Sequence, residues 1–290
     1  SRLRTPVTRK YSSLQMSVGR IENPTMNRSL PSDDGKRIKS LDTAFHILDI
    51  LSDGQVTQSE ITDRVDHSKS TVHYYLKTLE SRRYVVRTDD GYRLGLRCLE
   101  LAETALEQHG FPTQINEEVE KLAEQVGATA VIATEESGKC IHLHVHVPDD
   151  DCCRAYRVGT EYPLHATAVG KAVMAHLGRE EVVDIVDHYG LPEMTDNTIT
   201  DREALFSELS TIREQEVAVD DGEHLNGIKG IAAPVFDDDA VYGAVGIVAP
   251  RTALEDSHSR FKAQRFAKTP VNAVKRSARL IGNKLSDADE

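Results

Sequence analysis

Near the N-terminus, helix-forming apolar patterns alternate with short polar breaks. The first pattern places four apolar residues on one helical face: Ile38, Leu41, Phe45 and Leu48. It predicts a helix over residues 40–51, which the turn sequence Ser52-Asp53-Gly54 ends. Thr57 and Glu60 form a capping-box pair, and this pair predicts a second helix to about residue 65. The polar break at residues 66–68 separates that helix from the next.

The third predicted helix, over residues 69–81, has two chemically different faces. At about 100° per residue, Val72, Leu76 and Leu79 form a narrow apolar stripe that must pack inward. Hydroxyl groups, an imidazole and positive charge lie opposite, on Ser70, Thr71, His73, Tyr74, Lys77 and Ser81. Ser68 precedes the helix and can cap its N-terminus. This face is suited to binding a polyanion.

Two short β-rich runs at residues 84–87 and 92–94 flank an Asp-Gly turn, which is a strong hairpin signal. Three helices followed by a hairpin predict a winged helix-turn-helix, whose third helix enters the major groove while the wing approaches the DNA backbone. We expect phosphate contacts from Ser68, Lys69, Arg87 and Arg93. Base or groove contacts are expected from Ser70, Thr71, His73, Tyr74 and Lys77. Alternatively, the polar face is only solvated, or the unit binds protein.

Residues 98–109 form a further helical pattern, with Leu99, Ala102 and Leu106 at spacings of three and four residues. Spacing alone leaves open whether this seam is a dimer contact or packs on the front domain.

Beyond residue 110, strands and helices interleave, which predicts an α+β domain with an antiparallel sheet. Strands are expected at 128–134, 139–147, 228–236 and 241–248, and helices at 115–126, 167–176, 180–189, about 200–215 and about 270–285. A capping box formed by Thr200 and Glu203 opens the fourth of these helices.

Charge is distributed unevenly over the 290 residues, whose formal net charge is -12. Residues 1–35 carry six Lys/Arg against three Asp/Glu, residues 36–96 ten against nine, and residues 97–290 nineteen against thirty-five. A mildly basic front and an acidic back suit a protein whose front binds a polyanion. The Ser-, Arg- and Pro-rich residues 1–35 lack apolar periodicity and predict a disordered tail. The abundance of Asp points to a salt-adapted prokaryote.

Composition excludes several classes of protein. No apolar run approaches the roughly 18 residues of a membrane span. Four cysteines without disulfide or zinc-ribbon spacing, and no secretory signal, favour a cytoplasmic protein without cofactors. Gly170-Lys171 lacks the first glycine and the Ser/Thr of a phosphate loop, and no hydrolase or metalloprotease motif occurs. We therefore expect no enzyme activity.

His142, His144 and His146 alternate with apolar residues, which predicts that all three imidazoles lie on one face of a strand. Cys140 shares their parity, and Cys152 and Cys153 follow an acidic turn. Imidazole and thiolate bind zinc, so a metal- or redox-sensing protein is the alternative function. Successive histidines two apart along a strand are about 6.6 Å apart, too far for three to surround one ion unaided. We therefore predict a polar strand face and no metal.

The helix-turn-helix residues, Ser68 to His73 with Leu76, Leu79-Glu80 and Tyr84-Val85, resemble the signature of the IclR family of transcriptional regulators. Residues 163–172, PLHATAVGKA, and residues 227–234 resemble motifs of that family's effector domain. The resemblance implies a winged helix-turn-helix at 36–97, a linker helix at 98–110 and a GAF-like effector domain at 111–285. It also implies double-stranded operator DNA, a small-molecule metabolite and a second copy of the chain, as dimer or tetramer, as partners.

The same resemblance implies effector contacts from Ala168, Val169, Asp220, Gly230 and Gly246. Gly230 stands where the family often has cysteine, and Gly246 where some members have serine. Losing a thiol and a hydroxyl predicts a roomier pocket with fewer hydrogen-bonding groups. The expected effector is therefore larger or less polar than a small carboxylate.

Overall fold

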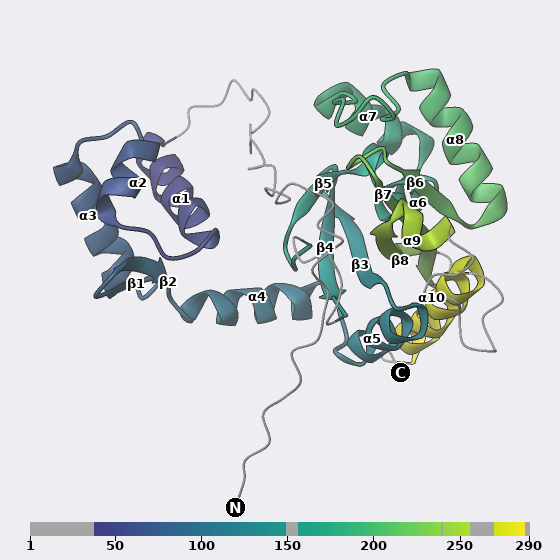
Figure 1. Cartoon of the computed structure of the whole chain (residues 1–290), viewed down its shortest axis with the longest axis horizontal. Helices are drawn as coiled ribbons and strands as arrows, with labels where there is room; N and C mark the ends of the chain where they lie inside the picture. Colours follow the sequence, from purple (N-terminus) through teal and green to yellow (C-terminus); the bar gives the residue numbers. More distant parts are fainter. Residues whose placement is uncertain (1–37, 149–155, 239, 256–269, 288–290) are drawn as a thin grey trace, which may run out of the picture. The chain divides into compact units, whose positions relative to one another are not determined.

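The structure is a computed structural model that describes residues 38–148, 156–238, 240–255 and 270–287 (Figure 1). The predicted tail and the two cysteines Cys152 and Cys153 lie outside these ranges. The chain divides into two compact units, with the boundary between Ile115 and Asn116. We call the described residues before this boundary the N-terminal unit and those after it the C-terminal unit.

The N-terminal unit contains the three helices and the hairpin that the sequence predicts. Helices α1 (Lys39–Ser52), α2 (Gln58–Arg64) and α3 (Lys69–Ser81) precede strands β1 (Val85–Thr88) and β2 (Gly91–Leu94), and α4 (Arg97–Gln108) follows. The capping box of α2 is confirmed, since Thr57 Oγ1 accepts from Glu60 N and Glu60 Oε2 accepts from Thr57 N at 2.7 Å. These elements form a winged helix-turn-helix.

The core of this unit uses a different face of α1 from the one that defined the helix in sequence. Its buried residues are Ile47, Ile50 and Leu51, which pack with Val72 and Leu76 of α3. Of the predicted stripe, Leu48 packs at the edge of this core, whereas Ile38, Leu41 and Phe45 face solvent and are 63%, 52% and 63% exposed. No residue of α4 is buried. The N-terminal unit therefore exposes apolar side chains on two of its helices.

The connection from α3 to the wing is sterically fixed. Arg83 adopts a left-handed backbone conformation with φ 65°, and Tyr84 N donates to Leu79 O of α3 at 3.0 Å. Beyond β2, Gly95 N donates to Tyr84 O at 2.8 Å. A Cβ atom at Gly95 would lie 2.1 Å from Arg83 O. Only glycine therefore lets the end of the wing pack this closely on the end of the helix.

The C-terminal unit is built on one six-stranded antiparallel sheet in the order β5-β4-β3-β8-β7-β6 (Figure 1). The strands are β3 (Thr129–Glu136), β4 (Lys139–His146), β5 (Glu161–Pro163), β6 (Ala218–Asp221), β7 (Ile228–Asp237) and β8 (Ala240–Pro250). Strand β7 is buried at successive positions, which requires cover on both sheet faces. The unit is α+β, as predicted.

Helices cover both faces of this sheet. The core on one face combines sheet residues with side chains of α6 (Ala168–Met174), α7 (Arg179–Tyr189) and α8 (Arg202–Gln215). On the other side, Glu120 of α5 (Gln114–Val126) reaches His144 of β4, and α10 (Pro270–Ser286) packs on β7. A short turn, η1 (Leu164–Ala166), leads into α6, and α9 (Arg251–Glu255) follows β8. Within the described ranges, no helix combines the length and apolar character that crossing a membrane requires.

Two sequence interpretations of this unit are wrong. The register of β4 against β3 shifts by one residue, so that Ala133 pairs with His142 but Ile132 pairs with His144. This β-bulge places His142 on one face of the sheet and His144 and His146 on the other, rather than all three on one face. The cap of α8 is Asp201, whose Oδ1 accepts from Ala204 N at 2.8 Å, and not Thr200.

Candidate DNA interface and effector site

Helix α3 separates its two faces as the pattern predicts. Val72 and Leu76 are fully buried, and Leu79 packs at the edge of the same core. On the opposite side the proposed groove-facing residues Ser70, His73, Tyr74 and Lys77 are exposed, and Tyr74 is 66% exposed. The helix therefore presents hydroxyl, imidazole and ammonium groups to solvent from a rigidly packed base.

The N-terminus of α3 is held by short hydrogen bonds. Ser68 Oγ accepts from Thr71 N at 3.2 Å, and the two side-chain hydroxyls lie 2.9 Å apart. Thr71 is half-buried, whereas Ser68 and Lys69 are exposed. Gln58 Nε2 of α2 donates to Lys69 O at 3.0 Å. This role of Gln58 could not be predicted from the sequence, because a contact between a side chain and the backbone of another helix has no periodic pattern.

The two wing arginines are exposed but are not brought together. Arg87 pairs with Tyr92, and Arg93 pairs with Val86 across the hairpin. Directly opposed residues of antiparallel strands share a face, and neighbours along a strand alternate, so Arg87 and Arg93 project from opposite faces. Each arginine thus needs a separate test as a phosphate contact.

The five proposed effector residues gather beneath the N-terminal end of α6. Asp220 pairs with Gly230 across β6 and β7, and a Cβ at Gly230 would lie 3.2 Å from Ala168 Cβ. On the neighbouring strand, a Cβ at Gly246 would lie 3.1 Å from Val169 Cγ1. The resemblance therefore selected residues that form one cluster in space.

The two glycines of this cluster do not create a roomier pocket, and that prediction is wrong. A Cβ at Gly246 would lie 2.7 Å from Ile231 O and 2.9 Å from Ala232 Cβ. At Gly230 the added atom would crowd Ala168. Both glycines instead allow α6 to approach the sheet closely, because the helix occupies the space that larger side chains would need.

Asp220 is the acidic centre of the cluster. It is 5% exposed, and its Oδ1 accepts from Glu223 N at 2.7 Å and from His224 N at 3.3 Å. Burial raises the pKa of its carboxyl to about 7, and the charge of Glu223 adds to that rise. Near neutral pH a bound charge can therefore change the protonation of Asp220.

A fully buried lysine, Lys171, lies next to this centre. Its Nζ lies 2.6 and 2.8 Å from the two carboxylate oxygens of Glu223 and 3.3 Å from Glu208 Oε1. These bonds tie α6 to the loop between β6 and β7 and to α8. The sequence placed Lys171 in the family motif at residues 163–172 and in a rejected phosphate loop, but it did not indicate this ion-pair network, because the partners are distant along the chain.

Two histidines and two tyrosines form a cluster beside Asp220. The His142 ring lies 5.8 Å from that of Tyr156 in a stacked geometry and 4.8 Å from that of Tyr162. The His224 ring meets Tyr162 edge-on at 4.6 Å. We call these four residues the aromatic cluster. The sequence did not indicate it, since Tyr162 belongs to a three-residue strand and His224 to a loop.

Among the described residues, the histidines of the alternative histidine–cysteine site are not arranged to share one ion, and Cys152 and Cys153 lie outside these residues. His144 faces α5, where its Nε2 lies 3.8 Å from Glu120 Oε1, while His142 lies in the aromatic cluster. Burial raises the pKa of the Cys140 thiol to about 12, which keeps it protonated. Across the described ranges, no group of three or more His, Cys, Asp or Glu side chains could hold a metal ion.

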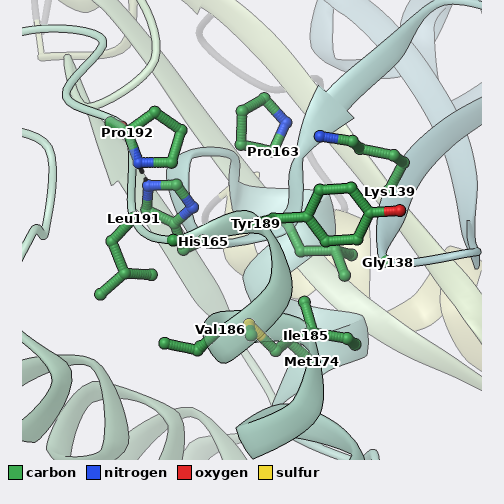
Figure 2. Close-up of a pocket in the computed structure, with 12 residues that line it drawn as sticks. Gly138, Lys139, Pro163, His165, Met174, Ile185, Val186, Tyr189, Leu191 and Pro192 are labelled. Carbon is green, nitrogen blue, oxygen red and sulfur yellow. Dashed lines mark hydrogen bonds between the residues drawn. The ribbon is translucent and has the colours of Figure 1, made fainter. Parts of the chain in front are cut away.

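A separate small pocket lies between η1 and α7 (Figure 2). Lys139 Nζ lies 4.1 Å from the centre of the Tyr189 ring, and His165 Nε2 lies 3.1 Å from Pro192 O. The cavity volume is about 20 Å³, which suffices for about one water molecule. We therefore regard this pocket as packing around Tyr189 and not as a site for a metabolite.

Comparison with known proteins identifies both units. Residues 103–281 match the model of the bacterial transcriptional regulator IclR C-terminal family, and residues 41–92 match that of the MarR family. The chain is 32% identical over 261 residues to a protein of Halobacterium salinarum named as the HTH-type transcriptional regulator ArcR, an alignment that covers 87% of this chain and 96% of the relative.

Solved structures share the fold. An IclR transcriptional regulator from Alicyclobacillus acidocaldarius is 26% identical, with a TM-score of 0.68 over 87% of this chain and 100% of that chain. An IclR homologue from Microbacterium hydrocarbonoxydans, complexed with 4-hydroxybenzoate, is 23% identical, with a TM-score of 0.69 over 86% of this chain and 99% of that chain. The chain therefore belongs to the IclR family, whose members are DNA-binding transcriptional regulators and not enzymes.

Proposed function

We propose that the chain binds operator DNA through α3 and the wing, and that a small metabolite bound in the C-terminal unit changes that affinity. The observation that carries this proposal is the two-faced burial of α3. Val72 and Leu76 anchor the helix in the core, while Tyr74 and Lys77 stand exposed on the other side. A helix presented in this way can enter the major groove without disturbing the fold.

The proposed DNA contacts fall into two groups. Ser68, Lys69, Arg87 and Arg93 would contact phosphates and so fix position, whereas Ser70, Thr71, His73, Tyr74 and Lys77 would contact bases or the groove. The bond between the hydroxyls of Ser68 and Thr71 favours roles for both near the entry of the helix into the groove. The mildly basic front of the sequence supports the same assignment.

The proposed effector site is the cluster of Ala168, Val169, Asp220, Gly230 and Gly246. The contacts between α6 and strands β6 to β8 support it, because a ligand at this place would touch a helix and a sheet at once. The solved homologue that carries 4-hydroxybenzoate supports a small organic ligand in this family of folds. Effector binding would favour the arrangement of the two units for which the ligand has the higher affinity.

We further propose that the chain acts in the cytoplasm as a homodimer or homotetramer, with α1 and α4 as the contact between copies. Both helices expose large apolar side chains: Ile38, Leu41 and Phe45 on α1, and Leu99 and Leu101 on α4. Two-fold symmetric operators require two copies of the reading helix. The proposed domain limits are 36–97 for the DNA-binding domain, 98–110 for the linker helix and 111–285 for the effector domain.

The test is a selection of binding sites from random DNA, followed by affinity measurements on the selected sequence. We expect a preferred operator, and we expect Lys77→Ala to raise the Kd for it by about tenfold while changing the Kd for unrelated DNA much less. Lys121→Ala, which removes an exposed lysine from α5, is the matched control and should leave both constants unchanged. The absence of any sequence preference would refute the proposed function.

A further inference from the structure

The aromatic cluster contains buried polar atoms without partners. His142 is 1% exposed and His224 is 8% exposed. Nδ1 of His142 and both ring nitrogens of His224 are buried and accept or donate no hydrogen bond within the described part of the chain. A buried polar atom without a hydrogen bond lowers the free energy of unfolding, so its presence needs an explanation. One explanation is a ligand that supplies the missing hydrogen bonds.

These imidazoles are uncharged at neutral pH. Burial lowers the pKa of His142 to about 3 and that of His224 to about 4. A neutral imidazole has one bare nitrogen, which accepts a hydrogen bond, and one N–H, which donates one. Together with the faces of Tyr156 and Tyr162, the cluster thus offers bare acceptor nitrogens, imidazole N–H groups and electron-rich rings, and no positive charge.

The charge next to the cluster is negative. The hydrogen-bonded network that includes Asp220 contains three carboxylates, of Asp220, Glu223 and Glu208, and one ammonium group, of Lys171. Lys171 is already bonded to both oxygens of Glu223. Oδ2 of Asp220 accepts no hydrogen bond from the described residues, since both backbone donors reach Oδ1. An anionic ligand here would meet uncompensated negative charge.

We propose that the aromatic cluster and Asp220 together bind an organic cation, with an ammonium or guanidinium group that donates to Asp220 and the imidazoles and lies against the tyrosine rings. Such a group satisfies the bare nitrogens, offsets the excess of carboxylates and gains cation–π attraction from Tyr156 and Tyr162. The inference rests on the proposed effector site and names the chemical class of its ligand.

The direct test is titration of the full chain with four probes of similar length: butylguanidinium, butylammonium, pentanamide and pentanoate. Because the chain has nine tyrosines, whose emission would not report on the cluster alone, binding is measured by isothermal titration calorimetry. We expect the two cations to bind and the amide and carboxylate to bind at least about tenfold more weakly. Comparison of butylguanidinium with butylammonium shows which cation the site prefers.

Variants locate the binding. Asp220→Asn keeps an oxygen for the two backbone donors but removes the charge, and it should raise the Kd of the cations by about tenfold or more. Tyr162→Leu should weaken the binding of the same two cations, because it removes an aromatic ring face. His176→Gln is the matched control, because His176 contacts Phe236 outside the cluster, and it should change nothing. Unchanged cation affinity in both cluster variants, with unchanged melting temperatures, would overturn the inference.

Proton exchange gives an independent readout. Three titratable groups lie next to Asp220: Glu223 and His224 in the loop between β6 and β7, and Lys171 on α6. The His224 ring in turn contacts Tyr162 of β5, which contacts His142 of β4. A cation bound there lowers the pKa of Asp220, so binding at pH 7 should release protons, measured as buffer-dependent heat. Proton uptake would contradict the inference.

The inference and the proposed function can fail separately. If pentanoate or another anion binds at Asp220 and alters operator affinity, the proposed effector site is supported and the proposal of a cationic ligand is refuted. If the cations bind as expected but saturating cation leaves operator affinity unchanged, the proposed ligand class is supported. The proposed control of DNA binding by that ligand is then refuted.

Discussion

Residues with unusual protonation concentrate around one point of the C-terminal unit. Burial raises the pKa of Asp220 to about 7 and lowers those of His142 and His224. Lys171 stays buried because two glutamates surround its ammonium group. Removing one partner from such a network leaves an uncompensated buried charge, so single substitutions there lower the stability of the fold.

The raised pKa of Asp220 predicts a specific pH dependence of stability. Its folded pKa exceeds the unfolded value, so Asp220 favours folding most below about pH 4, and this contribution is lost as pH rises towards 7. Asp220→Asn cannot ionise. The free energy of unfolding of Asp220→Asn, relative to that of the wild type, should therefore rise by about 3 kcal/mol between pH 5 and pH 8, measured by urea denaturation. A difference that does not vary with pH would contradict the raised pKa.

The positions of several residues of the candidate sites could be predicted from the sequence, and those of others could not. The face of α3 was assigned from periodicity alone, and the five effector residues, taken from a family resemblance, do meet in space. The histidine face was assigned wrongly because a single extra residue in β4 inverts the alternation, and no local pattern reveals a bulge. The aromatic cluster joins β4, β5 and a loop, so only the tertiary fold brings it together.

Among the secondary-structure elements, the long helices were predicted because apolar residues recur in them at helical spacing over several turns. Strands β5 and β6 and helix α9, of three, four and five residues, were missed because they are too short for a periodic signal. Helix α1 shows a further limit. Its apolar stripe correctly indicated a helix, yet the three buried residues Ile47, Ile50 and Leu51 lie on another face, and of the stripe itself Leu48 alone packs against the core.

The exposed stripe of α1 and the unburied α4 predict the site of self-association. Phe45→Ser and Leu99→Ser remove large exposed apolar side chains that contribute nothing to the core of the unit. We expect each variant to shift sedimentation towards the monomer at micromolar concentration while the thermal transition is retained. Val158→Ser, at an exposed apolar residue of the C-terminal unit, is the control. Unaltered sedimentation in both variants would place the contact elsewhere.

For the protein as a whole, the position of the charges matters more than the total charge. The chain as a whole is acidic, with a formal net charge of -12, although its proposed DNA-binding part is not. An acidic C-terminal part disfavours unspecific wrapping of DNA and leaves the N-terminal unit as the region suited to contact it. Removing one positive charge from the N-terminal unit should therefore change DNA binding more than removing one from the C-terminal unit.

Arg93→Ala and Arg202→Ala each remove one positive charge, from the wing and from α8 respectively. For Arg93→Ala we expect weaker binding to all DNA sequences alike and a salt dependence, as the slope of log K against log salt, that is shallower by about 0.9. Arg202→Ala should leave that slope unchanged. Equal slopes for the two variants and the wild type would remove Arg93 from the phosphate contacts.

The close packing of Gly95 on the Arg83 carbonyl has an evolutionary consequence. Because this joint uses backbone atoms and a missing side chain, it does not depend on which residues α3 shows to solvent. Substitutions on the outer face of α3 can therefore alter the sequence that is recognised while the wing keeps its orientation. Descendants of this chain could acquire new target promoters by exchanging a few surface side chains, without having to reinvent the scaffold that displays them.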